Sequence, residues 1–151
     1  MKKKTFDDQD PRSQKILSLD IGSKRIGLAL WNPQARLSRP LDVLKRKTLK
    51  QDLNLIKSLV ETEKIEAFLV GMPYGLNEQI TESTKNSIFW KETLEKNFDL
   101  PVYTFDESLS TKDAMDILQE RDVKMRSKTA LAKKDSFAAA LILEEFIRAK
   151  D

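Results

Sequence analysis

The sequence contains no cysteine and no histidine among its 151 residues. Without cysteine the chain has no disulfide scaffold, no thiol nucleophile and no thiolate ligand for zinc or an iron–sulfur cluster. Without histidine it has no Ser-His-Asp triad and no imidazole ligand. Catalysis must therefore use carboxylates, lysine, hydroxyl groups or the backbone. A bound metal would need oxygen ligands, which favours Mg²⁺ or Mn²⁺.

Long apolar runs are also missing from the sequence. No run approaches the roughly 20 residues that cross a bilayer, and the N-terminal lysines are followed by no apolar stretch of a secretory signal. We therefore expect a cytoplasmic protein with no membrane partner. Lys and Arg total 27 against 24 Asp and Glu, a net charge of +3 that permits a nucleic-acid partner without requiring one.

The length fits one domain, and hydrophobic patterning predicts an α/β fold. We expect a disordered tail over residues 1–14 and the domain over 15–151. Strands are predicted over Lys15–Leu19, Arg25–Trp31, Leu37–Leu44, Ala67–Gly71 and Val102–Phe105. Helices are predicted over Leu49–Thr62, Thr81–Asn97, Ser110–Arg121 and Ala130–Lys150. This order predicts a mixed five-stranded sheet, three strands antiparallel and then two parallel, with helices on both faces.

Carboxylates occupy three positions where α/β sheets bind ligands. Asp20 ends the first strand, Asp106 and Glu107 end the strand Val102–Phe105, and Asp135 lies near the start of the last helix on an otherwise apolar face. Each position also has an ordinary structural explanation. Asp20 could hydrogen-bond its own turn, Asp106 and Glu107 could belong to an ordinary strand-to-helix connection, and Asp135 could complement the helix dipole. Together they favour a cluster around Mg²⁺ or Mn²⁺. Two ions about 3.5–4 Å apart would clamp the attacking and leaving oxygens of a phosphodiester.

Candidate substrate contacts adjoin these carboxylates. The turn at Gly22 and Ser23 would let a phosphate approach the backbone closely, with Gly22 free to take positive φ. Tyr74, in a loop after a buried strand, could stack on a base, although an exposed tyrosine can be incidental. The basic candidates, which could equally be solvated surface charges, are Lys24, Arg25, Lys133 and Lys134.

Four segments carry a resemblance to a known family. They are LSLDIGSKRIGLA at Leu17–Ala29, FLVGMP at Phe68–Pro73, PVYTFDESLST at Pro101–Thr111 and KDSFAAALIL at Lys134–Leu143. In this order they resemble the YqgF/RuvX proteins, a Holliday-junction-resolvase-like branch of the RNase H-like fold whose members are described as nucleases of the 16S rRNA precursor. Two positions depart from the family pattern: Ser108 stands where an arginine is usual, and Lys134 where an aliphatic residue is common.

The resemblance implies a divalent-metal nuclease with Asp20, Glu107 and Asp135 as metal ligands and Asp106 as the alternative to Glu107. It implies RNA as the substrate, namely the rRNA precursor, free or in ribosomal precursor particles. Two alternatives stay open: resolution of branched DNA, and an inactive nucleic-acid-binding module of the same fold. The chain is expected to be a monomer or a weak homodimer.

Overall fold

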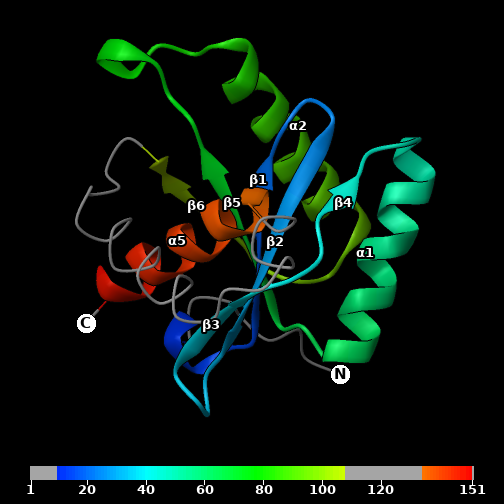
Figure 1. Ribbon diagram of the computed structural model, residues 1–151, viewed down its shortest axis with the longest axis vertical. Helices are drawn as coiled ribbons and strands as arrows, with labels where there is room; N and C mark the ends of the chain where they lie inside the picture. The colour runs from blue at the N-terminus through cyan, green and yellow to red at the C-terminus, as the bar shows by residue number, and fades with distance from the viewer. Residues whose placement is uncertain (1–9, 108–133, 151) are drawn as a thin grey trace.

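The structure, a computed structural model, describes residues 10–107 and 134–150, and describes only the backbone of residues 134 and 135 (Figure 1). Its strands are β1 (Ile16–Ile21), β2 (Arg25–Asn32), β3 (Leu37–Pro40), β4 (Leu44–Lys45), β5 (Ala67–Met72) and β6 (Val102–Asp106). Its helices are α1 (Leu49–Glu63), α2 (Glu82–Asn97) and α5 (Lys134–Arg148), with short 3₁₀ turns η2 (Pro11–Ser13) and η3 (Leu76–Glu78).

The strands form one mixed sheet in the order β3-β2-β1-β5-β6, with β4 also paired to β2. The pairs β1–β2, β2–β3 and β2–β4 are antiparallel, whereas β1–β5 and β5–β6 are parallel. This arrangement confirms the predicted mixed sheet. The sheet has one strand more than expected because the segment predicted as a single strand over Leu37–Leu44 pairs with β2 in two separate pieces.

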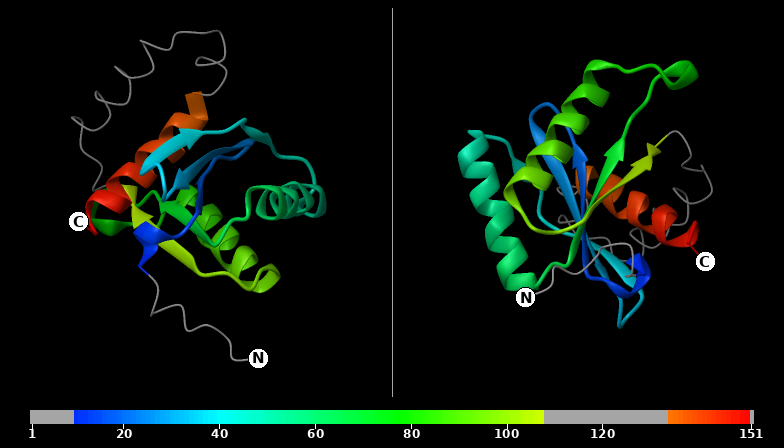
Figure 2. Two further views of the ribbon diagram at one scale, coloured as in Figure 1. Left: turned by 90° about the horizontal axis from the view of Figure 1, so that it is seen from below. Right: turned by 180° about the vertical axis from the view of Figure 1, so that it is seen from behind.

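Helices cover both faces of the sheet, as expected (Figure 2). One half of the core lies under α5, where Ile16 and Leu69 pack against Ala139 and Leu143. The other half lies under α1 and α2 and contains the fully buried Trp90. Buried side chains on both faces explain why β5 reads as a continuous apolar run.

Capping boxes fix where α1 and α2 begin. At α1, the Thr48 hydroxyl accepts from the Gln51 backbone N–H, and the Gln51 side chain reaches back to Thr48. At α2, Thr81 and Thr84 form the equivalent pair. Each box satisfies backbone donors that the first turn of a helix leaves without partners.

The predicted tail boundary at residue 14 differs from the structure, because residues 10–14 pack against the domain. The buried Gln14 accepts a hydrogen bond of 2.6 Å from the Tyr103 hydroxyl, and the Trp31 indole donates to the Arg12 carbonyl at 3.1 Å. The rest of the tail, residues 1–9, lies outside the described residues. So do the predicted helix Ser110–Arg121 and residues 130–133 of the last predicted helix. Within the described ranges no helix is long and apolar enough to span a membrane.

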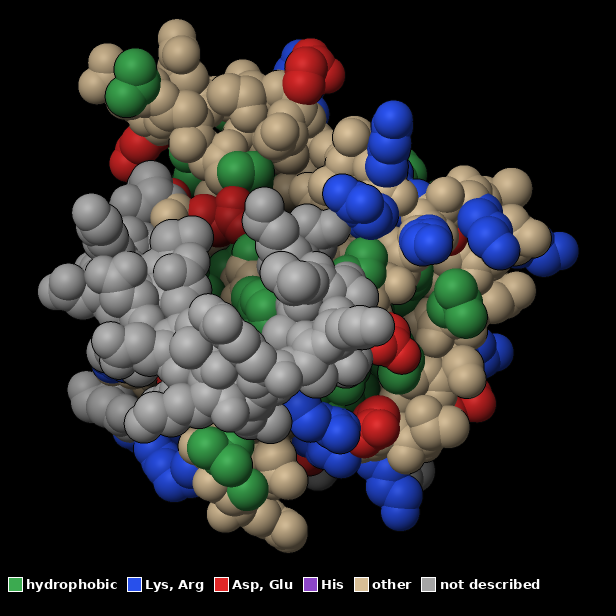
Figure 3. Space-filling view, in the orientation of Figure 1, with side chains coloured by type: hydrophobic (Ala, Val, Ile, Leu, Met, Phe, Trp, Pro, Cys, Tyr) green, Lys and Arg blue, Asp and Glu red, His purple; other side chains and the backbone are tan. Residues whose placement is uncertain are grey.

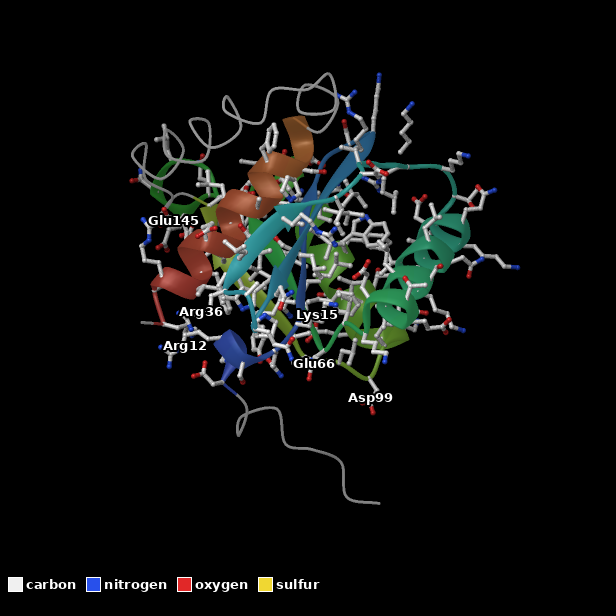
Figure 4. All side chains as sticks on the ribbon, turned by 60° about the horizontal axis from the view of Figure 1, so that its bottom comes forward. Arg12, Lys15, Arg36, Glu66, Asp99 and Glu145 are labelled. Atoms are coloured by element: carbon white, nitrogen blue, oxygen red, sulfur yellow. The ribbon has the colours of Figure 1, made fainter. Side chains whose placement is uncertain are left out.

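The edge of the sheet where β1 and β5 begin carries paired charges. Figure 4 labels Lys15 and Glu66 there, and the Lys15 backbone N–H donates to the Glu66 carboxylate at 3.0 Å. The Lys15 ammonium also lies 3.5 Å from Glu63. The candidate site lies at the opposite edge, where the parallel strands end.

Candidate active site

Asp20 and Glu107 come together on the α5 face of the sheet. Successive side chains of a strand point to opposite faces. In β1, Ile16 packs in the core under α5, so Asp20, four residues later, has the same orientation. In β6, Phe105 packs in that same core, and Glu107 follows it by two residues. The Asp20 and Glu107 carboxyl groups are hydrogen-bonded to each other, although 87 positions separate them in the sequence.

Gly71 supplies the space in which the Glu107 carboxyl sits. It lies in β5 between β1 and β6, opposite Phe105 in the parallel ladder. A Cβ atom at this position would lie 2.6 Å from Glu107 Oε1 and 2.7 Å from Ile142 Cδ1. Any larger residue would therefore push the Glu107 carboxyl or helix α5 away from its present position.

The electrostatics of the pair are those of two carboxyl groups held too close to ionise independently. Partial burial, the neighbouring Asp20 charge, a hydrogen bond to Asp20 and the Asp106 charge raise the pKa of Glu107 to about 8. At neutral pH this raised pKa favours the protonated form of Glu107 in the metal-free protein. A cation in the same place would remove this repulsion and replace that proton.

Glu107 and Asp106 are separated by the pleat of the strand. Val102 of β6 packs against the core on the α1 and α2 side, so Asp106, four residues later, points away from Asp20. The structure therefore brings Glu107, and not Asp106, to Asp20. The sequence favoured Glu107 only through the family resemblance.

Asp135 lies in the first turn of α5, one residue before Ser136. The backbone places this turn over the sheet: the Leu28 N–H donates to the Ser136 hydroxyl at 3.2 Å, and the Ser18 hydroxyl donates to the Ala139 carbonyl at 2.9 Å. Among the described side chains, no three acidic groups form a metal-binding cluster. The Asp135 side chain is outside that set, so its role as a ligand stays a prediction.

The turn between β1 and β2 borders the carboxylate pair. It forms an open pocket of about 210 Å³ lined by Asp20, Gly22, Ser23, Lys24 and Arg25. Gly22 does not use the positive φ that glycine permits, because no glycine in the described residues has one. Glycine is required there for close approach instead: a Cβ atom would lie 2.5 Å from the Arg25 carbonyl oxygen, to which the Gly22 N–H donates at 2.8 Å.

The other predicted substrate contacts are Tyr74, Lys133 and Lys134, and the structure does not place them at the pocket. Tyr74 is half-buried and packs against the core under α1 and α2. Its side chain is therefore not fully exposed in the loop. Lys134 lies at the start of α5 without a described side chain, and Lys133 lies outside the described residues. Neither lysine is tested by the structure.

Sequence reasoning missed a basic segment beside the pocket. The segment contains Lys45, Arg46 and Lys47. Lys45 is the last residue of β4 and lies opposite Arg25 of β2. The Arg46 guanidinium donates to the Gly22 carbonyl at 2.7 Å, and its backbone N–H donates to the Lys24 carbonyl at 2.9 Å. The available signal was the run of three cations directly before the capping residue Thr48.

The residues at this edge fit a hard divalent cation. Asp20 and Glu107 supply only carboxylate oxygens, the donors that Mg²⁺ and Mn²⁺ prefer. Gly71 leaves room for the Glu107 carboxyl beside Asp20, and the repulsion between the Asp20 and Glu107 charges is what a bound cation would relieve.

The comparisons of this sequence with known proteins agree on one family. A family model described as RuvX, Holliday junction resolvase, matches residues 14–149. A protein of Desulforamulus reducens named "Putative pre-16S rRNA nuclease" is 32% identical over 133 residues, which cover 88% of this chain and 96% of the relative. A protein of Koribacter versatilis with the same name is 33% identical over 133 residues, covering 88% of this chain and 86% of that protein.

Solved structures share the fold at low identity. RuvC of Thermus thermophilus, in complex with a Holliday junction substrate, has a TM-score of 0.53 and 18% identity, and the match covers 90% of this chain and 96% of that one. The fowlpox virus Holliday junction resolvase has a TM-score of 0.51 and 14% identity, covering 89% and 98%. These likenesses confirm the RNase H-like fold and carry no residue roles.

Proposed function

This chain belongs to the RuvX family, and from that membership and the carboxylate pair we propose that it is a divalent-metal-dependent nuclease that hydrolyses phosphodiester bonds. The observation that carries the proposal is the hydrogen-bonded contact between Asp20 and Glu107 at the ends of β1 and β6. Two acidic groups held in contact beside a pocket with basic residues suit a cation and a phosphate better than they suit stability alone.

In the proposed mechanism Asp20 and Glu107 hold Mg²⁺ or Mn²⁺, with Asp135 as the third ligand. When bound, such a cation supplies Lewis-acid stabilisation of the charge that develops on a phosphodiester. Glu107 has to give up its proton before it can serve as a ligand. Lys24 and Arg25 hold phosphates of the substrate at the pocket, and Gly22 keeps the turn tight enough for that approach.

The proposed substrate is the 16S rRNA precursor, which the names of the curated relatives give as their target. Purified protein should cleave a fragment of this precursor with Mg²⁺ or Mn²⁺ and stop when EDTA removes the metal. Asp20→Asn should abolish cleavage, whereas Asp99→Asn, an exposed change at the far edge of the sheet, should leave it unchanged. Cleavage by Asp20→Asn at the wild-type rate would contradict the proposal.

Branched DNA is the second candidate substrate, favoured by the family description and by the structural likeness to junction-bound RuvC. Symmetric resolution of a junction needs two active sites, and therefore a dimer. Light scattering with and without a four-way DNA junction, run beside a junction cleavage assay, separates the two substrates. A strict monomer that cuts only the rRNA fragment assigns the site to RNA.

A further inference from the structure

Five exposed cations lie on neighbouring elements beside the pocket, and we call them the basic surface: Lys24, Arg25, Lys45, Lys47 and Lys50. Lys24 and Arg25 line the pocket together with Asp20. The five cations come from the β1–β2 turn and the start of β2, from β4 and the connection that follows it, and from the first turn of α1. The β4 pairing places Lys45 opposite Arg25, so the β1–β2 turn and the segment that carries Lys45 and Lys47 form one continuous patch. Figure 3 shows Lys and Arg side chains gathered over these elements in the upper right of the view.

The segment that carries Lys45 and Lys47 is held in place from beneath. Between them, Arg46 points inward: its guanidinium donates to the Gly22 carbonyl at 2.7 Å and lies 5.8 Å from the centre of the buried Trp90 ring. The nearly fully buried Asp52 accepts from the Lys47 backbone N–H at 3.0 Å. The backbone is thus anchored while both lysine side chains are exposed, which lowers the conformational cost of binding a ligand there.

The lysine charges of the basic surface are not arranged for stability. At the opposite edge of the sheet, Arg12 pairs with Asp10 and Lys15 with Glu63. Within the described part of the chain, none of the basic surface's lysines is in an ion pair. Lys47 and Lys50 also flank the N-terminus of α1, where the helix dipole disfavours positive charge. Lysines that stand without an ion pair at an unfavourable place indicate an anionic ligand.

We propose that the basic surface binds the sugar–phosphate backbone of the nucleic-acid strand that runs from the carboxylate pair over β4 to the start of α1. Lysine is depleted from protein–protein interfaces but dominates contacts to phosphates, so a nucleic acid fits this surface better than an acidic protein does. Arg46 is a positioning residue, because its guanidinium is engaged with Gly22 and Trp90. The proposal rests on the proposed function for the direction of the strand.

The test compares two double variants of equal charge. Lys45→Gln/Lys47→Gln removes two cations of the basic surface, and Lys64→Gln/Lys96→Gln removes two exposed cations at the C-terminal ends of α1 and α2. Binding is measured by fluorescence anisotropy in EDTA, where cleavage is absent, with a labelled single-stranded RNA, its duplex and a four-way DNA junction. Each titration is repeated over a range of salt concentrations.

The proposal predicts weaker binding for the first variant only, on the order of tenfold at about 0.1 M salt. The slope of log K against log salt should also become shallower by about 0.7–0.9 for each phosphate that the variant no longer neutralises. Thermal unfolding should show unchanged stability in this variant, which excludes misfolding as the cause. Equal affinities and slopes for the two variants would overturn the proposal.

These outcomes are independent of the nuclease activity. If Asp20→Asn abolishes cleavage while the Lys45/Lys47 variant binds like wild type, the proposed function holds and the basic surface does not. If Asp20→Asn cuts normally while the Lys45/Lys47 variant binds nucleic acid more weakly, the surface holds and the proposed metal site fails. Weaker binding to an acidic peptide, with nucleic-acid affinity unchanged, would assign the surface to a protein partner and overturn the proposal.

Discussion

Gly71 is the residue at which the smallest change should have the largest local effect. An added methyl group would lie 2.6 Å from Glu107 Oε1 and 2.7 Å from Ile142 Cδ1. We predict that Gly71→Ala reduces nuclease activity by displacing the Glu107 carboxyl and lowers the free energy of unfolding by about 1–3 kcal/mol, measured by denaturant titration. Gly75→Ala is the matched control, because the nearest atom there, Thr81 Cγ2, is 3.0 Å away. Equal effects at both positions would mean that Gly71 has no special relation to Glu107.

The Glu107 proton makes stability depend on pH. Its pKa rises from an ordinary 4.5 to about 8 in the folded, metal-free protein. Between these values the folded protein holds a proton that the unfolded chain has released, so the free energy of unfolding falls as pH rises through this window. We predict that Glu107→Gln flattens this decline in melting temperature in EDTA.

Glu61→Gln, at an exposed carboxylate on α1, is the control for that measurement. It should keep the wild-type decline between about pH 5 and pH 8. A Glu107→Gln profile that overlays the wild-type one would show that the carboxyl pair does not share a proton.

At the scale of elements, α5 is fixed over the sheet at the point where the edge strand is interrupted. Between β3 and β4 the Leu41 N–H still donates to the Leu28 carbonyl at 2.8 Å, while the Leu28 N–H donates to the buried Ser136 hydroxyl. Ser136 thus connects the first turn of α5, which carries Asp135, to β2.

We predict that Ser136→Ala lowers the free energy of unfolding by about 1–3 kcal/mol, because it leaves the Leu28 N–H buried without an acceptor. The cleavage rate should also fall by more than the loss of folded protein accounts for, because the turn that carries Asp135 loses its hydrogen bond to β2. Ser58→Ala, on the exposed side of α1, should change neither quantity. Chemical denaturation and a cleavage assay on the same samples check this, and an unaffected Ser136→Ala protein would contradict it.

Most strands and helices could be predicted from the sequence. It was insufficient where a strand divides at a single backbone hydrogen bond, or where the face of the sheet on which a side chain lies matters. The continuous apolar run of β5 and the hydrophobic spacing of α1 and α2 predict those elements correctly. Where the third strand divides, the Leu28 N–H donates to the Ser136 hydroxyl of a distant helix and not to a strand partner. No local pattern encodes that contact.

The same limit applies to the site. The sequence places Asp20 and Glu107 at strand ends, yet adjacent carboxylates such as Asp106 and Glu107 look alike until the sheet assigns each a face. The proposed role of Lys45 and Lys47 depends on the β4 pairing, which places Lys45 opposite Arg25. Long-range pairing, which spacing alone does not reveal, decided both cases.

At the scale of the whole molecule, the two edges of the sheet have different charge arrangements. The edge at Lys15 carries ion pairs such as Lys15–Glu63, which contribute little to stability individually. At the edge near Asp20, two carboxyl groups are in contact, and the exposed Lys24 and Arg25 line the adjoining pocket with Asp20. The net charge of +3 conceals this asymmetry, because a divalent cation between the carboxylates would offset their negative charge.

The most direct test of this account compares Glu107→Gln with Asp106→Asn in cleavage of the 16S rRNA precursor and a four-way DNA junction with Mg²⁺ or Mn²⁺. The two carboxylates are neighbours in sequence but point to opposite faces of the sheet. We predict that Glu107→Gln lowers the cleavage rate by at least about 100-fold, more than removal of an outer-shell partner typically costs. Asp106→Asn should stay within a few-fold of wild type. Cleavage by Glu107→Gln at the wild-type rate, or an equal decrease in both variants, would contradict the assignment of the site to Asp20 and Glu107.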